Sequence, residues 1–155
     1  MASTVSAGTL KVKIIEEIKL NGKDQGGVTS FNIASINEVY KRIIACTASQ
    51  TTTIATFAND VYETVGAIDI EDSKYIRVTN LDSANAIELA IVTVYTTYQV
   101  KLDASQSHIL GSANDLMLAE ADTSPSFGTM ADVKSIQVNP GSNEVDVEIL
   151  VASAS

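Results

Sequence analysis

The residues whose types could support catalysis lie around one histidine. His108 is the only histidine of the chain, and Asp103, Ser105 and Ser107 precede it closely. Serine, histidine and aspartate form nucleophilic triads, in which the imidazole activates the hydroxyl and the carboxylate orients the imidazole. In a strand, however, Ser107 would point to the opposite face from His108. We therefore interpret His108 as a surface or strand-end residue and predict no catalytic residue, with a hydrolase kept as a less favoured alternative.

A second group with chemical potential is the acidic run Asp69, Glu71 and Asp72. Carboxylate oxygens from one loop can bind Ca²⁺, but the run lacks the glycine and the distal glutamate of a dedicated calcium loop. A solvated turn is the favoured interpretation and a metal site the alternative, so we predict neither a metal nor a cofactor. Cys46 is the only cysteine, which excludes an intrachain disulfide and favours a small buried hydrophobic residue.

The candidate contact residues for a partner are Lys11, Lys13, Lys19 and Lys23. They suit an acidic partner surface, and they equally suit the protection of a strand edge against aggregation. The chain carries a net charge of −9, and most of the acids follow Arg42. Because such a surface repels phosphate backbones, we predict no nucleic-acid partner.

Length and composition favour one domain with an aliphatic core. The 155 residues are 45% hydrophobic but only 5% aromatic, without tryptophan, so Ile, Val, Leu and Ala must fill the core. No apolar run approaches the ~20 residues of a membrane span, and the N-terminus lacks a secretory layout, so we expect no membrane partner and no export. We predict a flexible N-terminal arm over residues 1–9 and a single β-sandwich domain over residues 10–155.

Two hairpins are predicted from alternating patterns, one near each end of the chain. In residues 10–20 apolar side chains alternate with lysines, and Asn21-Gly22 is a turn signal before the alternating residues 29–33. Near the C-terminus, β-branched residues at 145, 147, 149 and 151 alternate with mostly acidic ones, which predicts a half-buried strand. The shorter run at 136–138 and the turn residues 139–143 precede it, so we predict a closing hairpin.

The middle of the chain predicts further strands. Residues 35–48 fit either a helix, capped by Ser35 and Glu38, or a strand over residues 40–46, which is favoured. Residues 86–102 are too long for one strand and predict a bend at Thr96-Thr97. Residues 111–134 form a long connection, expected to cover one end of the sheet or to meet a neighbouring subunit. The predicted fold is all-β, an antiparallel β-sandwich that is jelly-roll-like, with at most one short helix.

Four stretches of the chain resemble small virion structural proteins of tailed bacteriophages, marine ones in particular. The stretches are INEVYKRIIACTAS at 36–49, KYIRVTNLD at 74–82, YQVKLDASQSHIL at 98–110 and SIQVNPGSNEVDVEILVAS at 135–153. They are strand and turn patterns that span most of the chain.

The resemblance implies a non-enzymatic β-sandwich that decorates or cements a capsid. The expected partners are the major capsid protein and further copies of the chain, as a homotrimer or another homo-oligomer. The expected location is the capsid exterior of the virion, after synthesis in the host bacterial cytoplasm. Packaged DNA makes the capsid interior anionic, so an acidic protein is better placed outside.

Two other functions stay open. One is a tail, collar or fibre component of the virion. The other is a carbohydrate-binding module, which would have to use tyrosines as stacking platforms because tryptophan is absent. The available tyrosines are Tyr40, Tyr62, Tyr75, Tyr95 and Tyr98.

Overall fold

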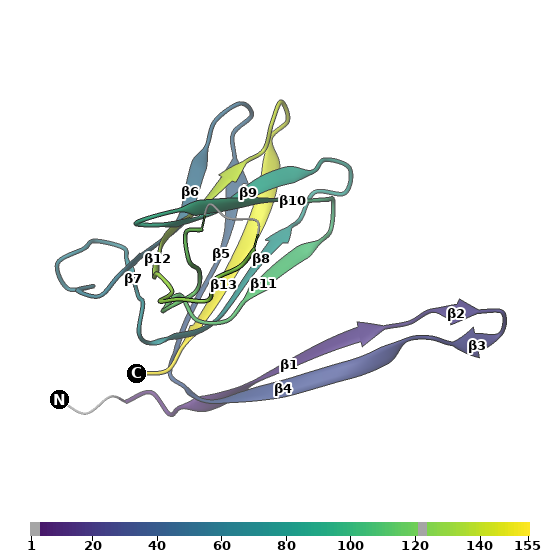
Figure 1. The fold of residues 1–155 in the computed structure, drawn as a ribbon, viewed down its shortest axis with the longest axis horizontal. Helices are drawn as coiled ribbons and strands as arrows, with labels where there is room; N and C mark the ends of the chain where they lie inside the picture. The colour runs from purple at the N-terminus through teal and green to yellow at the C-terminus, as the bar shows by residue number, and fades with distance from the viewer. Residues whose placement is uncertain (1–3, 121–123) are drawn as a thin grey trace.

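The computed structural model describes residues 4–120 and 124–155, and this part of the chain consists of strands and loops without a helix. Two sheets pack face to face, and a two-stranded ribbon extends away from them (Figure 1). The prediction of an all-β antiparallel sandwich is therefore confirmed. Within the described ranges no helix is long and apolar enough to cross a membrane. The strands are β1 Gly8–Glu16, β2 Lys19–Leu20, β3 Lys23–Asp24, β4 Gly27–Ile36, β5 Glu38–Cys46, β6 Thr52–Ala58, β7 Ile68–Asp69, β8 Ser73–Asn80, β9 Ile87–Thr93, β10 Thr97–Leu102, β11 Ser107–Leu110, β12 Val133–Asn139 and β13 Val145–Ser153.

The sandwich has a five-stranded sheet and a four-stranded sheet. The first has the order β10-β9-β12-β6-β7, and the second has the order β11-β8-β13-β5. All pairings within them are antiparallel except that of β6 with the short strand β7. The main core lies between the two sheets and is aliphatic, as the composition predicts. Its largest fully buried side chains are Ile54, Ile70, Ile76, Ile87, Leu89, Ile91, Ile136, Ile149, Val78, Val133, Val138 and Val145.

Strand β13 lies inside the four-stranded sheet, between β8 and β5. Its β-branched residues Val145, Val147, Ile149 and Val151 are all buried in the main core. The period-2 alternation thus correctly predicts which face of this strand is buried.

The predicted closing hairpin is wrong. Strand β12 pairs with β6 and β9, whereas β13 pairs with β5 and β8, so the two strands belong to opposite sheets. The turn residues between them make a corner that passes from one sheet to the other. The connection between β5 and β6 makes the reverse crossing beside it, and the N–H of Ser49 donates to the carbonyl of Gly141.

In the ambiguous middle segments the strand interpretation is confirmed. Residues Glu38–Cys46 form β5, so the helix that Ser35 and Glu38 would cap is absent. Ser35 instead has φ 62°, a left-handed conformation at a bulge in β4. The bend expected at Thr96-Thr97 is the turn between β9 and β10, which occupies residues 94–96, and Thr97 is the first residue of β10.

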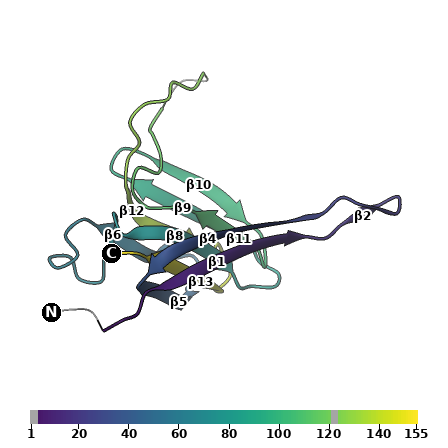
Figure 2. The ribbon, with the colours of Figure 1, turned by 90° about the horizontal axis from the view of Figure 1, so that it is seen from below.

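In the connection between β11 and β12, residues 111–120 and 124–132 extend from the sandwich on the side of β9 and β10 (Figure 2). At its base Ala113 is buried, and Leu116 and Met117 pack against the main core, so this part covers one end of the sandwich as expected. A bridge between Met117 and Ala131 holds the two sides of the loop together.

The predicted N-terminal arm over residues 1–9 falls partly outside the described residues, because residues 1–3 are not among them. Strand β1 begins at Gly8, inside the predicted arm. The flexibility of the arm and the single domain over residues 10–155 stay predictions.

A buried asparagine ties together two further crossings between the sheets. Asn80 at the end of β8 is fully buried, and its amide nitrogen donates to the carbonyls of Asn85, Leu102 and Asp103 at 2.8, 3.2 and 3.2 Å. Its side-chain oxygen accepts from the N–H of Asp82. One side chain thus holds the β8–β9 connection against the β10–β11 connection.

We expect Asn80→Ala to destabilise the sandwich by about 2 kcal/mol, because buried carbonyls lose their donor without access to water. Urea denaturation followed by circular dichroism measures this loss. Asn143→Ala is the control, because its exposed amide bonds only the Asn85 side chain, and it should stay within about 0.5 kcal/mol of the wild type. Equal stability of the two variants would contradict the proposed role of Asn80.

Candidate interaction ribbon

The most distinctive surface of the molecule is the ribbon, which we define as residues 8–36 with strands β1 to β4. Strands β1 and β4 pair antiparallel from Leu10 opposite Ile33 to Glu16 opposite Gly27. The same register continues through β2 and β3 to a two-residue turn, where Asn21 has φ 51° and Gly22 has φ 75°. Positive φ at both residues is typical of a type I′ hairpin turn, as Asn-Gly predicts. The first predicted hairpin is therefore confirmed.

The base of the ribbon is anchored on the outer face of the four-stranded sheet. Val12 and Ile36 of the ribbon pack with Tyr75 and Ala152 of the sheet in a second buried apolar cluster. The ring of Phe31 also contacts that of Tyr75, with 6.4 Å between the ring centroids. This cluster holds the near end of the ribbon in place.

Beyond the base, the described residues place no sheet on either side of the ribbon, and its apolar side chains are exposed. It projects well past the sandwich in two perpendicular views (Figures 1 and 2). Exposed apolar residues in its outer part are Ile14, Ile15, Ile18, Leu20 and Val28. A two-stranded hairpin is at best marginally stable in water, and a concentration of exposed apolar side chains on it is typical of an interaction surface.

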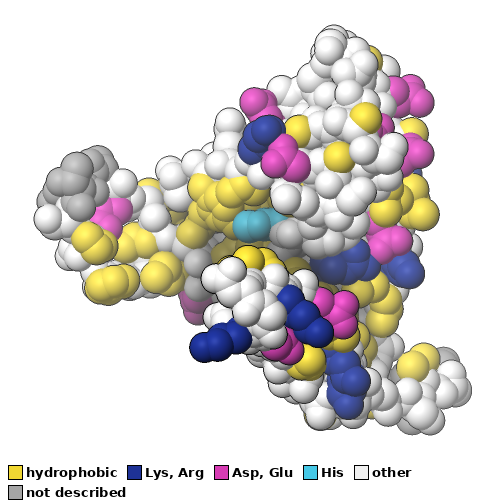
Figure 3. All heavy atoms as spheres, turned by 90° about the vertical axis from the view of Figure 1, so that its right-hand side faces the viewer, with side chains coloured by type: hydrophobic (Ala, Val, Ile, Leu, Met, Phe, Trp, Pro, Cys, Tyr) yellow, Lys and Arg dark blue, Asp and Glu magenta, His cyan; other side chains and the backbone are white. Residues whose placement is uncertain are grey.

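The structure places all four candidate lysines on the ribbon, and all four are exposed. Lys11 and Lys13 lie on one face of β1, while Lys19 and Lys23 lie near the turn. Figure 3 views the molecule from the free end of the ribbon, where basic, acidic and hydrophobic side chains lie close together. The structure therefore brings the lysines onto one projecting element, apart from the acidic sandwich.

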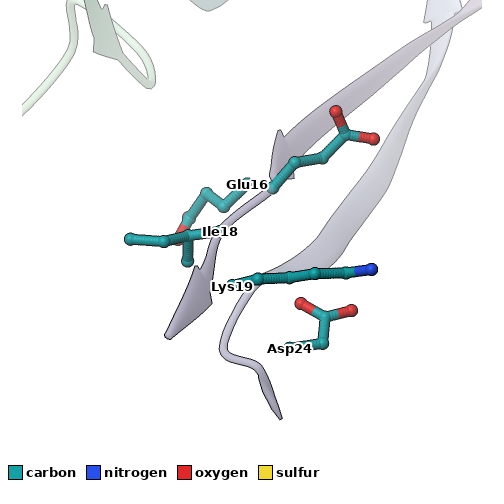
Figure 4. Close-up of a pocket in the computed structure, with 5 residues that line it drawn as sticks. Glu16, Ile18, Lys19 and Asp24 are labelled. Atoms are coloured by element: carbon teal, nitrogen blue, oxygen red, sulfur yellow. The ribbon is translucent and has the colours of Figure 1, made fainter. Parts of the chain in front are cut away.

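The two strands of the ribbon approach each other closely between β1 and β2, where Gly26 lies against the backbone of Glu16. A methyl group at Gly26 would overlap the carbonyl oxygen of Glu16, so only glycine fits this position. Beside this close approach, Glu16 and Lys19 point to one side of the ribbon and Ile18 to the other (Figure 4). The alternation predicted for residues 10–20 is thus broken between Glu16 and Ile18. An open hollow of about 390 Å³ lies here and is lined by Glu16, Glu17, Ile18, Lys19 and Asp24.

An apolar groove of about 400 Å³ lies at the base of the ribbon, on the outer face of the four-stranded sheet. The ribbon contributes Leu10 and Ile36 to its lining, and the sheet contributes Val39, Leu150 and Ala152. Sequence reasoning missed this groove. The available signal was Leu150, an apolar residue on a strand face that otherwise carries acids.

The structure brings no triad together around His108. Its Nε2 lies 3.0 Å from the hydroxyl of Tyr98, and burial lowers the pKa of His108 below its usual 6.5. The hydroxyl of Ser107 instead bonds that of Thr79 at 2.7 Å, while Asp103 pairs with Lys101. His108 is therefore a half-buried strand residue with a tyrosine neighbour.

The acidic run before β8 forms a turn. The carboxylate of Asp69 accepts hydrogen bonds from the backbone N–H groups of Glu71 and Asp72. In the described part of the chain, no group of three or more His, Cys, Asp or Glu residues could hold a metal ion. Cys46 is buried, as expected, and its burial raises the pKa of the thiol.

No protein-family model matches the chain, and no curated protein matches it. Among solved structures, the chain is similar to one described under "Bacillus endospore appendages form a novel family of disulfide-linked pili". The two share 6% identity with a TM-score of 0.43, over 100% of this chain and 96% of the other. This likeness is too distant to indicate a function.

We expect Gly26→Ala to open the outer part of the ribbon, because the added methyl group would overlap the Glu16 carbonyl oxygen and force the two strands apart. Amide hydrogen exchange of residues 19–24 should accelerate about tenfold while the sandwich keeps its protection. Gly27→Ala is the matched control, because a methyl group there meets nothing within 4 Å. Equal exchange in both variants would show that the close approach at Gly26 does not stabilise residues 19–24.

Proposed function

We propose that the protein is a non-enzymatic structural component of a tailed-phage virion, a decoration protein that attaches to the outer surface of the capsid shell. The observation that carries the proposal is the ribbon, a basic and apolar element that projects from an acidic body. Residues 8–36 contain four lysines and three acids, whereas the remainder from residue 37 contains six basic and sixteen acidic residues. The phage context rests on the resemblance described above.

The charge distribution supports attachment through the ribbon. An acidic body is repelled by an acidic shell and by packaged DNA, so the ribbon is the part that can approach either without a large electrostatic penalty. Exposed apolar residues beside the lysines would supply the affinity, while the lysines would guide the approach. The major capsid protein is the proposed partner, and the sandwich would face solvent.

A non-enzymatic role is supported by how the polar side chains are used. The hydroxyl of Ser107 is engaged with Thr79, and the imidazole of His108 lies against Tyr98. Carbohydrate binding has less support than decoration, because Tyr75 is buried and Tyr40 and Tyr98 are half-buried. The two exposed tyrosines, Tyr62 and Tyr95, lie in different connections, β6–β7 and β9–β10.

The proposal is tested by the copy number and position of the protein in purified phage particles. For decoration, quantitative mass spectrometry should find a stoichiometry comparable to that of the major shell protein, and electron microscopy should locate the protein over the whole outer surface. A low copy number at one vertex would instead assign it to the tail or collar. Absence from the particle, or a position inside the shell, would overturn the proposal.

The lysines can be tested with shells assembled from the major capsid protein alone. We expect the double variant Lys11→Glu/Lys13→Glu to bind such shells at least tenfold more weakly in co-sedimentation, because it reverses the charge of the contact face. Lys74→Glu/Lys101→Glu makes the same charge change on exposed positions of the sandwich and should bind like the wild type. Wild-type binding should also weaken as salt is added. Equal loss in both double variants would point to net charge and against a ribbon contact.

A further inference from the structure

We propose that the tip of the ribbon binds a second copy of this chain, in the apolar groove at the base of that copy's ribbon. The tip is defined as residues 18–25, and its apolar residues Ile18 and Leu20 are 50% and 57% exposed. Both residues lie just before the Asn21-Gly22 turn, and neither belongs to either buried cluster. Apolar side chains at such a position do not stabilise the fold of their own chain, so their role lies in an intermolecular contact.

The groove has the complementary character. Its lining is mainly aliphatic, and Val39 itself is 56% exposed. The aliphatic lining residues are Val5, Leu10, Ile36, Val39, Leu150 and Ala152, and Ser6, Gly8, Thr9 and Asn37 complete the lining. It is also continuous with the surface on which the chain's own ribbon is anchored, since Ile36 and Ala152 belong to both. The groove therefore extends a surface that already packs ribbon residues.

Charge favours a second copy as the occupant. Two sandwiches of this chain repel each other, because each remainder beyond the ribbon has sixteen acids against six basic residues. The tip carries Lys19 and Lys23 against the single acid Asp24, a net charge of +1, and the groove-lining residues Asn37 and Val39 flank the exposed Glu38. The tip is thus the surface that can approach an acidic neighbour with attraction.

The length of the ribbon reduces the remaining repulsion. From Val12 in the anchored base to Leu20 at the tip, eight residues of strand span about 27 Å at ~3.4 Å per residue. This exceeds the Debye length of about 8 Å at physiological salt, so most charges of one sandwich would be screened from those of the next.

The geometry also determines the kind of assembly. Tip and groove are different surfaces of one chain, so the contact is heterologous and gives rings if the rotation closes or open chains if it does not. Lys11 and Lys13, whose charge reversal tests the shell contact, lie on β1 outside the tip, so one ribbon can serve both contacts. The inference does not depend on the phage context.

The test is sedimentation velocity of the purified full chain over a range of concentrations. The wild type should form species larger than a monomer as concentration rises. Ile18→Ser/Leu20→Ser, in the tip, and Val39→Ser, in the groove, should each be monomeric over the same range. The control for the tip variant is Val94→Ser, because Val94 lies in a turn of the sandwich and is about as exposed as Ile18 and Leu20. The control for Val39→Ser is Ile43→Ser, because Ile43 lies on the same strand, is about as exposed as Val39 and does not line the groove. Both controls should associate like the wild type.

Mixing the two monomeric variants decides between modes of association. The Val39→Ser chain keeps an intact tip and the Ile18→Ser/Leu20→Ser chain keeps an intact groove, so an equimolar mixture should form one-to-one dimers and nothing larger. A wild type that stays monomeric would overturn the proposal, as would association of the tip variant at wild-type strength. If only the tip variant lost association and Val39→Ser associated like the wild type, the groove would not be the binding site of the tip. That result would overturn the proposal and indicate contact between two tips.

Discussion

The structure depends on strand β13, which is buried on its inner face along its length and on its outer face at Ala152, toward its C-terminal end. Its inner face places Val147 and Ile149 in the core between the sheets. Its outer face places Ala152 in the second cluster, with Leu150 packed against it, where Val12 and Ile36 hold the ribbon. One strand therefore joins the sandwich to the element that projects from it. Loss of its outer-face contacts would release the ribbon while leaving the main core intact.

The ribbon combines a firm base with an unsupported end. At the base, the bulge at Ser35 redirects β4, and Asn37 bonds Ser155 beyond the end of β13. At the far end, no sheet among the described residues covers either face of the ribbon. Order there comes from the type I′ turn and from the close approach of the two strands at Gly26. Such an element gains stability when a partner covers it. This is the physical reason why the ribbon, and not a pocket in the sandwich, is the candidate functional site.

Most polar residues that invite a chemical interpretation instead maintain loops between strands. Asn80 spans two sheet crossings, and the carboxylate of Asp69 closes a turn. Asp82 accepts from the N–H groups of Asn85 and Ala84, and these hydrogen bonds lower the pKa of its carboxyl. In a sandwich whose chain passes repeatedly between two sheets, each corner exposes backbone groups that need partners. Short polar side chains at the corners provide them.

The sequence by itself determined the local features of this protein. Alternation in residues 145–151 identified the buried face of β13, and Asn21-Gly22 identified the turn of the ribbon, because side-chain period and turn type depend only on neighbouring residues. Only the tertiary structure decided that β12 and β13 lie in opposite sheets, since a short turn between two apolar runs suits a hairpin and a corner equally well. It also decided that four lysines spaced along the chain share one projecting element and that Leu150 faces a groove. Both depend on which strands pack together, and that choice is made by the burial of the whole chain and not by any one segment.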